Sequence, residues 1–200
     1  MNLPTDFVNK YQQLMGKSEA AQFIASFDEP TTPGFRLNPL KASQPTDLDL
    51  SEPTEHCRFG YHGQVSGKTI DHQSGAVYSQ EPSAMFVGEV AHPSEGMRVL
   101  DLCASPGGKS THLSSFLQQT GLLVSNEIMS KRAKVLAENT ERFGLSNTLV
   151  LNEDPATIAK VFPVFFDQVL VDAPCSGEGM FRKDPDAVNY WSTDYPVACA

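Results

Sequence analysis

The stretch Asp101-Leu-Cys-Ala-Ser-Pro-Gly-Gly-Lys-Ser110 decides the fold that we predict for this chain of 200 residues. It lies between an apolar strand pattern, Met97-Arg-Val-Leu100, and a helical pattern, Thr111-His-Leu-Ser-Ser-Phe-Leu117. A strand, a tight glycine turn and a helix start present backbone N–H groups to a polar cofactor group. The ending Gly-Gly-Lys-Ser also resembles a nucleotide-binding Walker A loop, but that loop requires a glycine where this chain has Cys103. A cofactor-binding turn therefore ranks above a site for a nucleoside triphosphate.

A second strand pattern, Val169-Leu-Val-Asp-Ala-Pro-Cys-Ser-Gly177, ends in an acid, a proline and a cysteine. Ligands of an open parallel sheet bind beyond the carboxyl ends of its strands, so we expect Asp101 and Asp172 to flank one crevice. A thiol there can form a covalent bond with a nucleobase, because thiolates are strong nucleophiles. Cys175 is thus a candidate catalytic residue, and the competing interpretation is a small buried residue in a turn.

Acids follow the other strands of the predicted sheet. Glu127 comes about 20 residues after the glycine turn, where an acid can accept hydrogen bonds from the ribose hydroxyls of an adenosyl group. The alternative role of Glu127 is to cap the helix that begins near residue 130. Asp154, with Glu153 as a competitor, is the candidate acceptor for an adenine amino group. These acids extend the predicted cofactor site along the edge of the sheet.

Basic residues near the two motifs are further candidates. Lys109 lies in the first turn of the helix, which favours a catalytic or substrate-contacting role over a solvated lysine. Arg182 and Lys183 follow the cysteine motif and can bind RNA phosphates, or form an ordinary solvated pair. His62 and His72 have no partners at metal-ligand spacing, and the four cysteines form no Cys-x-x-Cys pair, so the sequence predicts no metal site.

From residue 80 onward, strand and helix patterns alternate, which indicates an α/β fold with a parallel sheet. The predicted strands are 97–102, 121–126, 148–152 and 167–172, and the predicted helices are 82–90, 108–119, 130–143 and a poor one at 155–160. The preceding region is a small α+β domain, with helices at 5–15 and 18–27, a short strand at 35–38, a loop at 41–54 and a β-rich or irregular connector at 56–79. We therefore divide the chain into residues 1–79 and 80–200.

Composition limits the partners and the compartment. The net charge is −9 and neither half of the chain is basic, so any affinity for RNA must come from a local cationic strip or from parts outside this sequence. No apolar run reaches the ~20 residues that span a bilayer, and the N-terminus lacks the pattern of a signal peptide. We expect a cytoplasmic protein with free thiols and no membrane partner.

The two motifs resemble those of the Sun-type RNA cytosine-C5 methyltransferases. The segments Met180-Phe-Arg-Lys-Asp-Pro-Asp186 and Gly75-Ala-Val-Tyr-Ser-Gln-Glu-Pro-Ser-Ala-Met85 are similar to the bacterial branch that acts on small-subunit ribosomal RNA. The resemblance covers the whole chain, but only the N-terminal part of such an enzyme. It implies a Rossmann-like class I methyltransferase fold with an incomplete parallel sheet, preceded by an RNA-binding-like region.

The resemblance also implies the chemistry. A flipped cytosine of 16S rRNA, or of transfer RNA, enters the crevice. A thiolate adds to C6, the methyl group is transferred to C5, a base removes the C5 proton, and the thiol leaves. Asp172 holds the cytosine edge near N3 and Lys109 assists. The cofactor is S-adenosylmethionine, and the residues expected to bind it are Cys103, Ala104, Ser105, Pro106, Gly107, Gly108, Lys109, Glu127, Asp154 and Asp172.

One departure concerns the nucleophile. In this family it is a second cysteine, in a Thr-Cys motif on the next strand, while Cys175 aids product release. No Thr-Cys pair occurs in residues 1–200, and Cys199 follows an alanine, so we expect the main nucleophile beyond Ala200. The chain is then a fragment that is inactive alone. The alternatives are a non-catalytic module that binds a cofactor or the ribosome and, with less support, a nucleotide hydrolase. The sequence gives no indication of the oligomeric state.

Overall fold

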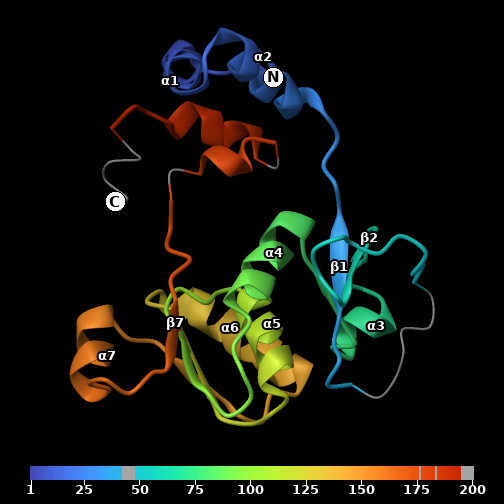
Figure 1. Ribbon diagram of the computed structural model, residues 1–200, viewed down its shortest axis with the longest axis vertical. Helices are drawn as coiled ribbons and strands as arrows, with labels where there is room; N and C mark the ends of the chain where they lie inside the picture. Colours follow the sequence, from blue (N-terminus) through green and yellow to red (C-terminus); the bar gives the residue numbers. More distant parts are fainter. Residues whose placement is uncertain (42–47, 176, 183, 195–200) are drawn as a thin grey trace. The chain divides into compact units, whose positions relative to one another are not determined.

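The computed structural model describes residues 1–41, 48–175, 177–182 and 184–194 (Figure 1). These residues form two compact units. One consists of residues 32–173, and the other combines residues 1–31 with the residues from 174 onward. The predicted division into an RNA-binding-like region, 1–79, and a methyltransferase region, 80–200, stays a prediction.

The larger unit is built on a four-stranded parallel sheet, as predicted. Its strands have the order β6-β5-β4-β7, and helices connect them along the chain. The strands are β4 (Arg98–Asp101), β5 (Leu122–Asn126), β6 (Thr148–Leu151) and β7 (Gln168–Leu170), and the connecting helices are α5 (Gly108–Leu117), α6 (Ser130–Phe143) and α7 (Pro155–Val161). The strand order reverses direction between β4 and β7, which is the place where open sheets of this kind bind ligands.

Alternating side chains give the sheet two apolar faces. Val99 and Leu123 pack with Leu113 and Leu117 of α5 on one face. The neighbouring residues on the same strands point the other way, and they pack with Ile158 of α7 and with partly buried aromatic side chains. A strand buried on both faces has a continuous apolar sequence, which explains why the sequence predicts strands at 97–102 and 121–126.

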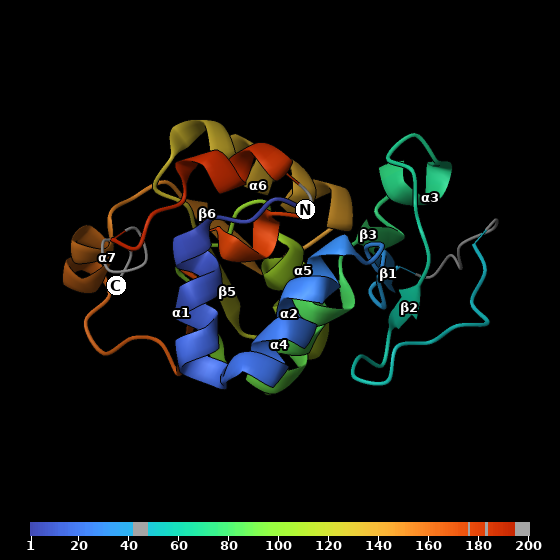
Figure 2. The same cartoon turned by 90° about the horizontal axis from the view of Figure 1, so that it is seen from above.

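A second, antiparallel sheet lies in the same unit, beside α4 (Pro82–Ala91) and α5 (Figures 1 and 2). Its order is β2-β1-β3, and the short helix α3 precedes its last strand. Its elements are β1 (Gly34–Leu37), β2 (Gly60–His62), α3 (Ile70–Gln73) and β3 (Val77–Ser79). Two of these strands fall in the region that we predicted only as a β-rich or irregular connector, because strands of three residues are too short to show a period.

The smaller unit has an aromatic core. Phe7, Phe181 and Trp191 are buried together, and Tyr11, Phe23 and Phe27 pack around them. Its elements are α1 (Thr5–Met15), α2 (Lys17–Ala25) and three short 3₁₀ helices, η1 (Ser26–Asp28), η2 (Glu178–Met180) and η3 (Pro185–Tyr190). The two predicted helices thus form as expected, and their apolar stripes are covered by residues from far along the chain. Among the helices that the structure describes, none has the length and apolar character needed to cross a bilayer.

Candidate functional site

The glycine turn joins the end of β4 to the start of α5, as predicted. Gly107 is the N-terminal cap of α5 and has φ +110°, a left-handed conformation that favours glycine. The amide of Ala104 donates to the carbonyl of Asn126 over 2.8 Å, and the amide of Gly107 donates to the carbonyl of Ala104 over 2.8 Å. Among the described residues, no side chain caps the start of α5. The first amides of the helix are therefore available to an external acceptor.

Contacts from α6 hold the outer side of this turn. Arg132 donates from Nη2 to the carbonyl of Ser105 over 2.8 Å, and Ser105 Oγ donates back to the carbonyl of Arg132 over 2.9 Å. Asn139 Nδ2 donates to the carbonyl of Pro106 over 2.7 Å. Ala104 and Ser105 are buried while Pro106 is exposed. The turn is thus fixed by several side chains that sequence reasoning did not single out.

A buried group of polar side chains lies under the turn. Ser125 Oγ donates to Ser110 Oγ over 3.0 Å, and Ser110 Oγ donates to Asp101 Oδ2 over 2.7 Å. Asp101 is fully buried, and its Oδ1 atom has no hydrogen-bond partner among the described residues. Burial raises the pKa of Asp101 to about 6, against the lowering effect of the Ser110 hydrogen bond. An acceptor atom buried without a donor is costly, so this oxygen marks a place for a donor.

Lys109 and Asp172 form an ion pair at the same edge of the sheet. Lys109 Nζ lies 2.6 Å from Asp172 Oδ2, and the two side chains are 22% and 48% exposed. The charge of Asp172 also raises the pKa of Asp101, although less than burial does. Lys109 is thus a counter-charge to both acids, since it pairs with Asp172 and its charge lowers the pKa of Asp101, while the crevice between them stays a prediction.

Glu127 lies at the end of β5 and is buried rather than solvated. Its Oε1 atom accepts a hydrogen bond from the amide of Met129 over 2.9 Å, and Oε2 lies 3.4 Å from Nη2 of Arg132. Asn126 fixes the neighbouring loops, because its Nδ2 donates to the carbonyls of Leu102 and Glu153. The N-terminal cap of α6 is Met129, with no side-chain cap hydrogen bond, so the alternative role of Glu127 as the helix cap is wrong, and its ribose-binding role stays a prediction.

Asp154 is the N-terminal cap of α7. Its two oxygens accept from the amide and the hydroxyl of Thr157, at 3.0 and 2.6 Å, and these hydrogen bonds lower its pKa. A capping acid of this kind stabilises a short helix without any ligand. Contact with an adenine amino group stays a prediction, which the capping hydrogen bonds neither require nor prevent.

The described cysteines differ in environment. Cys103 is half-buried in the glycine turn, and burial together with the nearby carboxylates raises its pKa, which keeps it a thiol. Cys175 is exposed and belongs to the smaller unit, as does Arg182, whose Nη1 lies 3.5 Å from the carbonyl of Ser26. The structure therefore brings the predicted cofactor residues together in one unit and describes Cys175 and Arg182 in the other.

Three positions named in the sequence analysis lie outside the described residues, namely Lys183, Cys199 and Ala200. The RNA-binding role of Lys183 accordingly stays a prediction. The main nucleophile, which we expect beyond Ala200, also stays a prediction, because the structure describes no residue after 194. Among the described cysteines, neither Cys57 nor Cys103 is preceded by a threonine, so neither replaces the expected Thr-Cys motif.

One group among the described residues has three metal-binding atom types close together. Cys57 Sγ and Glu89 Oε1 lie 3.8 and 3.2 Å from Nε2 of His112, which is fully buried. Burial, with the charges of Arg36 and His92, lowers the pKa of His112 to about 2, so the imidazole is neutral. With Nε2 protonated, His112 donates to Glu89, while its buried Nδ1 atom has no hydrogen-bond partner among the described residues. The absence of a metal stays a prediction.

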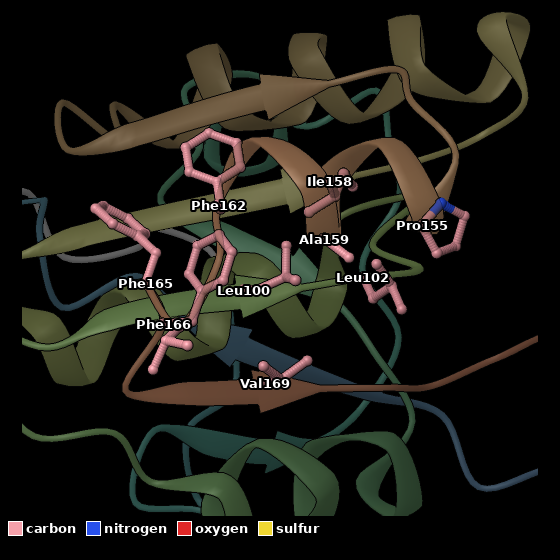
Figure 3. Close-up of a pocket in the computed structure, with 10 residues that line it drawn as sticks. Leu100, Leu102, Pro155, Ile158, Ala159, Phe162, Phe165, Phe166 and Val169 are labelled. Carbon is pink, nitrogen blue, oxygen red and sulfur yellow. The ribbon is translucent and has the colours of Figure 1, made fainter.

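The described cavity beside β4 and β7 is apolar. It has a volume of about 320 Å³ and lies between the sheet and α7, with aromatic side chains around it (Figure 3). Its lining residues are Leu100, Leu102, Pro155, Ile158, Ala159, Phe162, Val164, Phe165, Phe166 and Val169. Such a lining offers no charged side chain to a carboxylate, an ammonium group or a ribose. The polar chemistry is instead concentrated at the carboxyl ends of the strands.

Known proteins share both the sequence and the fold. The ribosomal RNA small subunit methyltransferase F of Pectobacterium carotovorum is 37% identical over an alignment of 211 positions, which covers 96% of this chain and 43% of that protein. The protein of the same name from Vibrio cholerae is 35% identical, covering 97% of this chain and 44% of its own length. A solved methyltransferase homolog from Pyrococcus horikoshii has a TM-score of 0.74 at 25% identity, over 92% of this chain and 63% of its own.

The chain thus spans less than half the length of the curated relatives that it matches. The Rossmann-like methyltransferase fold that the motifs implied is confirmed by the parallel sheet and by the solved homolog. A family model for the N-terminal domain of 16S rRNA methyltransferase RsmF matches residues 3–82. A second model, for 16S rRNA methyltransferase RsmB/F, matches residues 89–195 and so covers both motifs. The resemblance to the small-subunit ribosomal RNA branch is therefore confirmed, and the chain belongs to the 16S rRNA methyltransferase RsmB/F family.

Proposed function

We propose that this chain supplies the cofactor-binding part of an enzyme that uses S-adenosylmethionine to form 5-methylcytosine in 16S ribosomal RNA. The observation that carries the proposal is the polar cluster of Asp101, Lys109 and Asp172 around the glycine turn. It lies at the carboxyl ends of β4 and β7, where a sheet with this strand order binds its ligand. Family membership supports methyl transfer to ribosomal RNA, and the cytoplasm is where that RNA is found.

The residues present fit the cofactor. The uncapped start of α5 suits its carboxylate, and the unpartnered Oδ1 of Asp101 suits a hydrogen-bond donor such as its ammonium group. Glu127 would accept from the ribose hydroxyls and Asp154 from the adenine amino group. The segment 103–109 would follow the length of the bound molecule. When bound, S-adenosylmethionine supplies an electrophilic methyl group.

The chemistry on the base requires a nucleophile and control of charge. A thiolate attacks C6 of cytosine, and the electrons of the C5–C6 double bond move to C5, which takes the methyl group. A base then removes the C5 proton, the double bond forms again, and the thiolate leaves. Asp172 would hold the base near N3, and the positive charge of Lys109, whose Nζ lies 2.6 Å from Asp172 Oδ2, would stabilise the negative charge that develops on the base.

The remaining residues act at the periphery of this reaction. Cys175 would assist release of the product, and the attacking thiolate would come from a Thr-Cys motif on a strand that follows Ala200. Arg182 is exposed and carries guanidinium N–H groups that suit an RNA phosphate, and Lys183 would add a second charge. The cluster is acidic overall, so affinity for RNA depends on such local cations rather than on bulk charge.

Binding of S-adenosylhomocysteine to the 200-residue chain tests the cofactor assignment. We expect this product to raise the melting temperature, because a ligand that binds only the folded state stabilises it. ATP with magnesium should leave the melting temperature unchanged. Protection by ATP alone would overturn the assignment and favour the nucleotide hydrolase.

Methyl transfer tests the reaction. A protein that extends this chain through the Thr-Cys motif should move tritium from labelled S-adenosylmethionine to C5 of a cytosine in 16S rRNA. The 200-residue chain should transfer none, because it lacks that thiol. Equal rates for the two proteins would refute the assigned nucleophile. Cofactor binding without transfer by the longer protein would favour a non-catalytic module.

A further inference from the structure

Arg36 in β1 of the small antiparallel sheet is fully buried, which is unusual for a guanidinium group. Its Nη2 atom donates to Thr111 Oγ1 over 2.7 Å and to the carbonyl of Gly108 over 3.1 Å. Its Nε atom lies 3.3 Å from Gln80 Oε1. Two of these three acceptors belong to the first turn of α5, which begins at the glycine turn of the cofactor site.

The burial of Arg36 costs free energy that its hydrogen bonds do not fully offset. Burial lowers the pKa of Arg36 to about 10, so the group stays charged at neutral pH. Its Nη1 atom is buried with no hydrogen-bond partner in the described part of the chain. An apolar side chain would fill this place at lower cost. The side chain is therefore better explained by what it holds in position than by a gain in stability.

What Arg36 holds is the backbone of Gly108. Thr111 Oγ1 accepts from Arg36 and itself donates to the carbonyl of Gly108 over 3.1 Å, so both groups fix the same oxygen. The small sheet also packs against this glycine. A Cβ atom added at Gly108 would lie 3.1 Å from Gln80 Nε2 and 3.2 Å from the ring of Tyr78. Side chains from β1 and from the region of β3 thus contact the turn at Gly108.

We propose that Arg36 is a positioning residue for the cofactor turn, and that the small antiparallel sheet is in this way a part of the cofactor site. The inference rests on the proposed function, because it assigns the turn at 103–109 to S-adenosylmethionine. Arg36 acts on the cofactor only through Gly108 and Thr111. A small displacement of a binding group can lower the affinity for the ligand by a large factor, because the contacts of that group depend on positions to within tenths of an ångström.

The test measures the affinity of the 200-residue chain for S-adenosylhomocysteine by calorimetry. Arg36→Met keeps an apolar stem and removes all donors, and we expect it to weaken binding by about tenfold or more. Arg36→Lys restores one charged donor and should recover part of the affinity. The matched control is Asn38→Ala in the chain segment that follows β1. Asn38 Nδ2 donates to the carbonyls of Gly75 and Phe143, away from the turn, so its loss should lower stability and leave affinity unchanged.

Hydrogen exchange of the amides at 107–111, measured without ligand, separates the possible failures. If Arg36 positions the turn, these amides exchange faster in Arg36→Met and at the normal rate in Asn38→Ala. Should Arg36→Met not fold, Thr111→Val removes the hydroxyl that accepts from Arg36 and donates to the carbonyl of Gly108, and it should show the same two changes. Normal affinity and normal exchange in a folded variant would overturn the inference. Faster exchange, with no binding even by the unaltered chain, would instead contradict the proposed cofactor site and retain the positioning role.

Discussion

At the scale of single residues, the burial of Asp101 lowers stability, but it also places a hydrogen-bond acceptor at the candidate cofactor site. Its carboxyl group is fully buried, and only one of its oxygens has a hydrogen-bond partner among the described residues. Burial raises its pKa from 3.8 to about 6, so the folded state disfavours the ionised form. The contribution of Asp101 to stability is therefore fully present below pH 4 and is lost as the pH rises through about 6. A ligand that donates to Asp101 would recover part of this loss.

Replacing Asp101 by asparagine should consequently stabilise the chain at pH 8. The difference in the free energy of unfolding is on the order of 3 kcal/mol there, and it should shrink toward zero near pH 4. Urea unfolding followed by circular dichroism at the two pH values checks this. The same variant should lose affinity for S-adenosylhomocysteine, because it removes a charged acceptor.

Asp154→Asn is the control for this experiment. Asp154 is exposed and its pKa is lowered by the hydrogen bonds from Thr157, so the sign of its effect is reversed. Its contribution is present above its unfolded pKa and is lost as the pH falls. Asp154→Asn should therefore be less stable than the unaltered chain at pH 8. A gain at pH 8 in both variants would show that the effect of Asp101→Asn reflects the overall net charge rather than burial.

Sequence reasoning singled out the residues of the candidate site that belong to a motif, and it did not single out the side chains that contact them. Asp101, Lys109 and Asp172 were readable because they follow apolar strands or begin a helix, and strand ends meet at one edge of a sheet. Arg36, Ser125 and Arg132 gave no comparable signal. A single arginine in a short apolar strand is ordinarily exposed, and only the tertiary fold shows that this one is buried.

At the scale of elements, Gly75 is the point where the small sheet meets the end of α6. It has φ +73°, and a Cβ atom there would lie 1.9 Å from the carbonyl oxygen of Arg142. Gly75→Ala should therefore destabilise the chain by at least about 2 kcal/mol more than Gly96→Ala. Gly96 has φ +81° with nothing within 4 Å of the added atom, so it carries the backbone strain without the clash. Urea unfolding of the two variants measures the difference, and equal losses would contradict it.

Periodic elements were predicted closely, and short or non-local ones were not. The helix predicted at 130–143 is α6, and the strand predicted at 97–102 is β4 with shorter ends. Their apolar residues recur over enough positions to distinguish the pattern from chance. The pairing of β1 with β2 and β3 had no such signal, because it joins segments about 25 and 40 residues apart and depends on contacts rather than on propensity.

Glu178 links helix α1 to the segment that follows the cysteine motif. Its carboxylate accepts from Lys10, Tyr11 and Trp191, at 2.7, 2.6 and 2.7 Å. Burial opposes the ionisation of Glu178, but these hydrogen bonds outweigh it and lower its pKa. Its contribution to stability is therefore present at neutral pH and is lost as the pH falls through that lowered pKa.

Glu178→Gln should destabilise the smaller unit by roughly 1–3 kcal/mol at pH 7, with a smaller difference in acid. Trp191 is the single tryptophan of the chain, so its fluorescence reports unfolding of this unit. Glu19→Gln removes the same charge from an exposed position at the start of α2 and serves as the control. A pH-independent loss, or an equal loss in both variants, would argue against the hydrogen-bonded carboxylate.

At the scale of the whole molecule, β7 is an edge strand. Among the described strands it pairs only with β4, and Val169 and Val171 are 51% and 57% exposed. Unpaired strand edges with apolar side chains invite association with other chains. We expect the 200-residue chain to self-associate at increasing concentration, as measured by sedimentation velocity. Val171→Lys should reduce the association, whereas Val90→Lys, at an exposed position on α4, should not. An equal effect of both lysines would point to charge repulsion instead.

The smaller unit also has a consequence for synthesis on the ribosome. Phe7 and its neighbours on α1 and α2 are covered by Phe181 and Trp191, which are translated much later. The intervening residues 32–173 take on the order of ten seconds to add, at about 5–20 residues per second. During that interval the two N-terminal helices carry an unprotected aromatic surface outside the exit tunnel. We therefore expect this nascent segment to be open to chaperone binding until Phe181 and Trp191 cover it.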